Sequence, residues 1–65
     1  MADIAVQYGV VGATFYAETE AAEGWLENEL GRPDGLDWSW HVDDEFIDDL
    51  LDLAKGDGLT VAVRT

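Results

Sequence analysis

The chain contains no cysteine, so its 65 residues have to fold without the support of disulfide bonds. A domain of this size buries only about 60% of the surface that its unfolded chain exposes, so its apolar residues have to form one compact core. Hydrophobic residues make up 48% of the sequence, which is too many for an intrinsically disordered chain. The sequence therefore predicts a single folded domain over residues 1–65.

Three segments alternate apolar and polar residues with the period of two that is typical of half-buried β-strands. The first covers residues 3–17 and is interrupted at Gly9, which favours a hairpin over one long bent strand. The second covers residues 36–42 and the third runs from Leu59 to Arg64. In the second segment we expect Trp38 and Trp40 to pack in the core with Leu36 and Val42. If that face is exposed, it is instead expected to be a protein-docking surface.

Two helices are predicted between these segments. Thr19 is expected to cap the first helix, which ends at Gly31, and Asp43 is expected to cap the second, which ends at Gly56. The residues expected to face the core are Ala22, Trp25, Leu26 and Leu30 in the first helix, and Phe46, Ile47, Leu50, Leu53 and Ala54 in the second. The order ββαβαβ predicts an α+β fold with a three- or four-stranded, mainly antiparallel sheet and both helices on one face.

The charge balance excludes several kinds of partner. Fifteen acidic residues stand against three basic ones, and the net charge is −12. Nucleic acids and anionic lipids would repel such a chain, so we expect it to bind neither directly. It has no apolar run long enough to span a bilayer and no signal-peptide pattern at its N-terminus. A cytoplasmic location is expected.

Catalytic and metal sites are weakly supported. Asp37, Ser39 and His41 point the same way from one predicted strand, but residues two apart on a strand lie about 6.6 Å apart, whereas a nucleophile and its base must approach to about 3 Å. A hydrolase that uses His41 is the least favoured function. The acidic run from Asp43 to Asp52 lacks the glycine-centred loop of an EF-hand. We therefore predict no catalytic residue, no metal site and no cofactor.

The acidic residues of the two predicted helices form rows. They are Glu20, Glu23 and Glu27 in the first helix, and Asp44, Glu45, Asp48, Asp49 and Asp52 in the second. Exposed helices commonly place lysine or arginine four residues from an acid, but Lys55 is the only base in either helix. Four helical residues rise about 6 Å, a spacing similar to that of phosphates along a DNA strand. These eight residues are predicted to bind a basic, DNA-binding protein surface by mimicking DNA. A halophilic composition and simple solubility are the alternatives.

In its length, its lack of cysteine and these acidic rows, the chain resembles the small acidic anti-CRISPR proteins of phages that act on type I surveillance complexes, in particular type I-C. The resemblance implies a non-enzymatic, stoichiometric inhibitor in the host bacterial cytoplasm. Such an inhibitor binds the DNA-recognition surface of the complex and blocks the binding of target DNA. An immunity protein or antitoxin that neutralises a basic nuclease toxin would use the same electrostatics and is the alternative. The small core leaves open a monomer or a weak homodimer.

Overall fold

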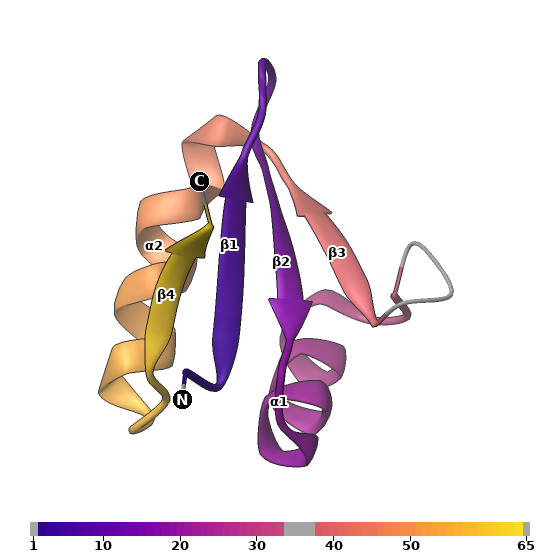
Figure 1. Ribbon diagram of the computed structural model, residues 1–65, viewed down its shortest axis with the longest axis vertical. Helices are drawn as coiled ribbons and strands as arrows, with labels where there is room; N and C mark the ends of the chain where they lie inside the picture. Colours follow the sequence, from indigo (N-terminus) through magenta and orange to yellow (C-terminus); the bar gives the residue numbers. More distant parts are fainter. Residues whose placement is uncertain (1, 34–37, 65) are drawn as a thin grey trace.

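A computed structural model describes residues 2–33 and 38–64 (Figure 1). The elements are β1 (Ile4–Tyr8), β2 (Ala13–Ala17), α1 (Glu20–Leu30), β3 (Ser39–Val42), α2 (Asp44–Gly56) and β4 (Val61–Arg64). The predicted element order ββαβαβ and the predicted α+β class are confirmed.

The four strands form one sheet in the order β3-β2-β1-β4. The two central strands make an antiparallel hairpin in which Val6 lies opposite Phe15. On one side Phe15 also lies opposite Trp40 of the antiparallel β3, and on the other side Val6 pairs with Val63 of the parallel β4. The sheet is therefore mixed, with two antiparallel pairings and one parallel pairing.

The hairpin turn is closed by glycine and attached to α2. Gly9 donates its backbone N–H to the carbonyl oxygen of Gly12 at 3.0 Å. Gly12 has a φ of +79°, and a Cβ at this position would collide with the carbonyl oxygen of Val42. The N–H of Gly12 donates to the Asp44 Oδ1 atom at 3.0 Å. Glycine is required here both by the left-handed backbone and by the close approach of β3.

Both helices lie on the same face of the sheet, behind the strands in the view of Figure 1, and contribute to one core. The largest fully buried side chains are Trp40, Phe15, Ile4, Leu26 and Val6. The indole of Trp40 donates from Nε1 to the carbonyl oxygen of Gly31 at 3.0 Å, so its polar atom is satisfied and the end of α1 is held against β3. The prediction that Trp40 packs in the core is confirmed.

The helix starts follow the predicted positions. The Thr19 Oγ1 atom accepts a hydrogen bond from the N–H of Ala22 at 3.2 Å, which is the expected N-cap. Asp43 is the N-cap residue of α2, but its side chain makes no capping hydrogen bond, and its backbone carbonyl accepts from the N–H of Phe46.

Four predicted core positions are wrong. Leu30, Phe46 and Leu53 are 38%, 55% and 54% exposed. Trp38 is 40% exposed and precedes β3, with a φ of +49° that interrupts the predicted strand, while Leu36 lies outside the described residues. A small four-stranded sheet covers only the middle of the apolar side of each helix. In α2 this covered part consists of Ile47, Leu50 and Ala54.

Candidate functional site

The five predicted acids of α2 lie outside the buried residues Ile47, Leu50 and Ala54 through which the helix packs on the sheet. All five are exposed; they are Asp44, Glu45, Asp48, Asp49 and Asp52. We call this surface the acidic face. Because residues three or four apart are neighbours on a helix, the five carboxylates form one continuous surface over residues 44–52.

Within residues 2–33 and 38–64, no ion pair reaches the acidic face. Lys55 is exposed at the end of α2 and pairs with none of these carboxylates. The Asp44 side chain alone has a structural contact, since it accepts the hydrogen bond from the N–H of Gly12. The negative charge of α2 is therefore left to solvent, counterions or a partner.

The acids of α1 form a separate row. Glu20 and Glu27 are exposed, and Glu23 is half-buried. Near the end of α2, the indole of Trp25 donates from Nε1 to the Asp57 Oδ2 atom at 2.6 Å, which ties α1 to the residue that follows α2. In the described part of the chain, no hydrogen bond or ion pair joins the α1 row to the acidic face, although the sequence predicts both rows as contact residues.

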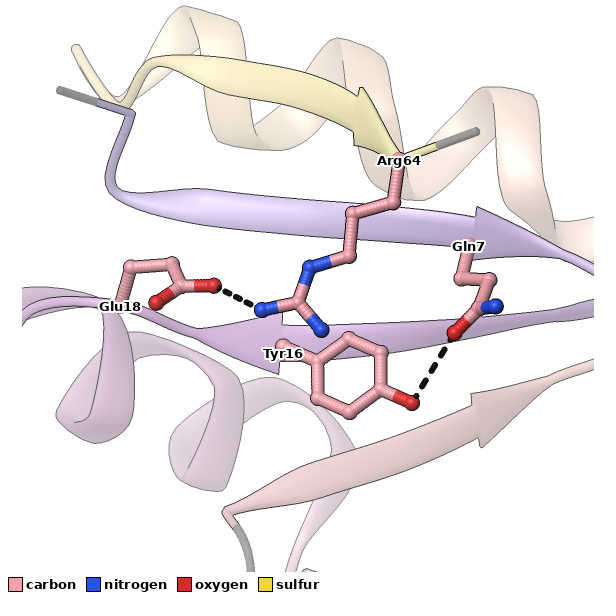
Figure 2. Close-up of polar contacts among 4 residues, drawn as sticks. All are labelled: Gln7, Tyr16, Glu18 and Arg64. Carbon is pink, nitrogen blue, oxygen red and sulfur yellow. Dashed lines mark hydrogen bonds and ion pairs between the residues drawn. The ribbon is translucent and has the colours of Figure 1, made fainter.

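The opposite face of the sheet is uncovered and carries a different arrangement of charge. Figure 2 shows Arg64 reaching from β4 across β1 toward β2. Its Nη2 atom donates to the Glu18 Oε1 atom at 2.6 Å, and its guanidinium carbon lies 4.3 Å from the centre of the Tyr16 ring. The Tyr16 hydroxyl donates to Gln7 at 3.3 Å. Arg64 therefore makes its ion pair and its ring contact on this face of the sheet, away from the helices.

Asp3, directly before β1, is hydrogen-bonded to the residues that precede α1 and β4. Its carboxylate accepts hydrogen bonds from the Thr60 backbone N–H and hydroxyl, at the start of β4, and from the hydroxyl of the α1 cap Thr19. The Thr60 N–H, followed by the Thr19 hydroxyl, lowers the pKa of Asp3, because both stabilise the ionised form. This acid supports the fold, as Asp44 does through Gly12, whereas the other four acids of the acidic face make no such contact with the described residues.

Metal binding and catalysis are the other chemistries considered for this chain. Among the described residues no group of three or more acidic or imidazole side chains is arranged to hold a metal ion. Ser39 and His41 lie on the uncovered face of the sheet, opposite Tyr16 and Thr14 of β2, and Asp37 lies outside the described residues. Neither helix in the described part of the chain has the length and hydropathy that crossing a bilayer requires.

Sequence reasoning missed one surface next to the acidic face. A shallow groove is lined by Leu30, Val42, Phe46, Asp49, Leu50 and Leu53. We call it the apolar groove. The sequence does contain a sign of this groove. The apolar side of α2 is wide, because Phe46 and Leu53, seven residues apart, lie beside the residues that face the sheet.

Comparison of the chain with protein-family models, with curated proteins and with solved structures gives no match.

Proposed function

We propose that this protein is a non-enzymatic, stoichiometric inhibitor that mimics DNA with its acidic face. The proposed target is the basic DNA-binding surface of a protein complex, namely a type I CRISPR surveillance complex. The observation that supports the proposal is the acidic face itself, in which five exposed carboxylates on one helix have no cation paired to them among the described residues.

The physical basis is that the acidic face attracts the same basic side chains that bind the phosphates of DNA. The Asp44, Asp48 and Asp52 side chains repeat about every 6 Å along the helix axis, so lysines and arginines placed for phosphates find carboxylates at a similar spacing. Long-range attraction between a basic channel and a protein of net charge −12 accelerates association and makes it steeply dependent on salt. The α1 row, Glu20 to Glu27, is a second contact surface in the proposal.

Unpaired charge along a helix also argues against a purely structural role. Like charges four residues apart destabilise a helix by a few tenths of a kcal/mol per pair. A sequence selected only for folding would place a base among them, as Arg64 is placed beside Glu18 on the sheet. We attribute the retained repulsion on α2 to the binding of a basic partner.

The test is inhibition of target-DNA binding by a purified type I-C surveillance complex, measured by gel shift with labelled duplex. The wild-type protein is expected to block the shift near one equivalent, and excess unlabelled duplex should displace it. The double variant Asp48→Lys/Asp52→Lys should lose inhibition by at least about tenfold, because charge pairs at such interfaces contribute about 1.5 kcal/mol or more each.

The matched control is Glu29→Lys, compared with the single variant Asp48→Lys. Both substitutions change the net charge equally, and Glu29 is exposed in α1 outside the predicted contact residues. Equal losses from the two would indicate a non-specific charge effect. Full inhibition by a folded Asp48→Lys/Asp52→Lys variant would refute the assignment of the acidic face. Neutralisation of a basic nuclease, with no effect on the surveillance complex, would favour the immunity-protein alternative.

A further inference from the structure

The apolar groove is an unusual surface for a protein this acidic. Phe46 and Leu53 are each more than half exposed on α2, and Leu30 lies across from them at the end of α1. The buried Leu50 and Val42 form its floor. The groove has a volume of about 190 Å³, below the range of about 300–1,000 Å³ that is typical of small-molecule sites. It is suited to an apolar side chain rather than to a cofactor.

The rim of the groove is negatively charged. Asp49 lines it directly. Glu45 and Asp52, four residues before and three residues after Asp49, are its neighbours on the surface of α2, and Glu27 is the corresponding neighbour of Leu30 on α1. No basic side chain is among the described residues that line the groove. An apolar centre with a polar, solvent-accessible rim is the usual anatomy of a protein–protein interface, and in this groove the rim carries negative charge.

We propose that the apolar groove binds a large apolar side chain from a basic segment of the partner protein, while lysine or arginine residues beside it pair with the acidic rim. The inference deepens the proposed function and rests on it for the identity of the partner, but the recognition chemistry is tested on its own. DNA mimicry alone provides no reason for an exposed phenylalanine and leucine beside the carboxylates. An apolar anchor lets the protein select one basic surface among many.

Electrostatic repulsion argues against two other occupants of the groove, a second copy of the chain and an anionic membrane. A second copy of the chain would bring two proteins of net charge −12 together, with an acidic rim on each side of the contact. An anionic membrane would repel the same rim. A positively charged segment with an apolar side chain can pair its charges with the acidic rim and place that side chain against the apolar floor of the groove.

The experiment uses two synthetic helical peptides of equal positive charge. One is lysine-rich with leucines at positions i, i+3 and i+7, and in the other these leucines are serines. The leucine peptide is expected to bind the wild-type protein at least about tenfold more tightly, since tenfold corresponds to about 1.4 kcal/mol and burial of one leucine is worth at least as much. Amide chemical-shift changes that depend on the leucines should map to the residues that line the groove.

Variants separate the apolar contribution from the charge contribution. In Phe46→Ser and in Leu53→Ser the preference for the leucine peptide should disappear, whereas Val10→Ser, at the fully exposed hairpin tip, should keep it. Asp48→Lys should weaken the binding of both peptides and leave their ratio unchanged.

Equal binding of the two peptides by the wild-type protein would overturn the inference, as would shifts outside the groove or a dimer that buries Phe46 and Leu53. Failure of the proposed function gives a different pattern, in which the leucine preference is present but the surveillance complex is not inhibited.

Discussion

Replacing Asp48 with lysine should make the protein more stable while it weakens the proposed inhibition. Asp48 is exposed in the middle of α2, with Asp44 four residues before it and Asp52 four residues after it. Neither neighbour has a cation paired to it in the described structure. The substitution turns two repulsive i, i+4 pairs into two attractive ones.

The expected gain follows from the size of these pairs. Each like-charge pair costs about 0.2–0.5 kcal/mol and each opposite-charge pair contributes about as much. Two pairs that change sign give roughly 1 kcal/mol after allowance for solvent screening, and the higher helix propensity of lysine acts in the same direction. A 65-residue domain unfolds with an entropy of roughly 0.14 kcal/mol/K, so the Tm should rise by about 7 °C.

The assay is thermal unfolding by circular dichroism in low salt, repeated in about 0.5 M sodium chloride. The variant Asp48→Asn, which removes the charge without reversing it, should show about half the gain. High salt should reduce both gains because it screens exposed charges. An unchanged or lower Tm for Asp48→Lys in low salt would contradict the reasoning, since the acidic face would then impose no repulsion on the fold. A gain in stability together with weakened inhibition is the pattern expected of residues retained for binding.

Three further predictions concern the fold. Gly12→Ala should lower the free energy of unfolding by about 2 kcal/mol or more in urea titrations, because it adds a collision with the Val42 carbonyl to the cost of a left-handed residue. Gly58→Ala, also at positive φ but in open space, should cost less, and equal losses would argue against the collision. The Tm of the wild-type protein should rise between low and moderate salt as its self-repulsion is screened, and a constant Tm would count against this. Asp3 has a lowered pKa in the folded state. Its ionised carboxylate therefore adds to the free energy of unfolding above the ordinary aspartate pKa of about 3.9, and this added stability is lost as the pH falls below that value. Asp3→Asn should therefore be less stable than the wild type at pH 7, and the difference in urea midpoint should disappear in strong acid; a difference independent of pH would show that the charge of Asp3 is not involved.

Local patterns predicted the elements well because their causes are local. The Thr19 hydroxyl caps α1 within one turn, and the glycines at 9 and 12 close the hairpin between neighbouring strands. Trp40 was predicted in the core from the alternation of one short segment. In each case the residues that determine the structure lie within a few positions of one another.

The errors lie where burial depends on distant elements. Helical spacing places Leu30, Phe46 and Leu53 on the apolar sides of their helices, but it does not say how wide the sheet beneath them is. The structure leaves these three side chains exposed, and they become the walls of the apolar groove. Trp38 shares the alternation of Trp40, yet its positive φ places it before the strand.

The candidate site divides in the same way. The acidic face could be predicted from sequence, because the spacing of Asp44, Asp48 and Asp52 along one helix and the scarcity of bases are properties of the chain alone. Only the tertiary structure decided that Arg64 pairs with Glu18 on the far side of the sheet and that a groove between α1 and α2 adjoins the acidic face. Periodicity determines which residues share a side of a helix, whereas strand order and the extent of the sheet determine which of those sides meet a neighbour and which remain in solvent.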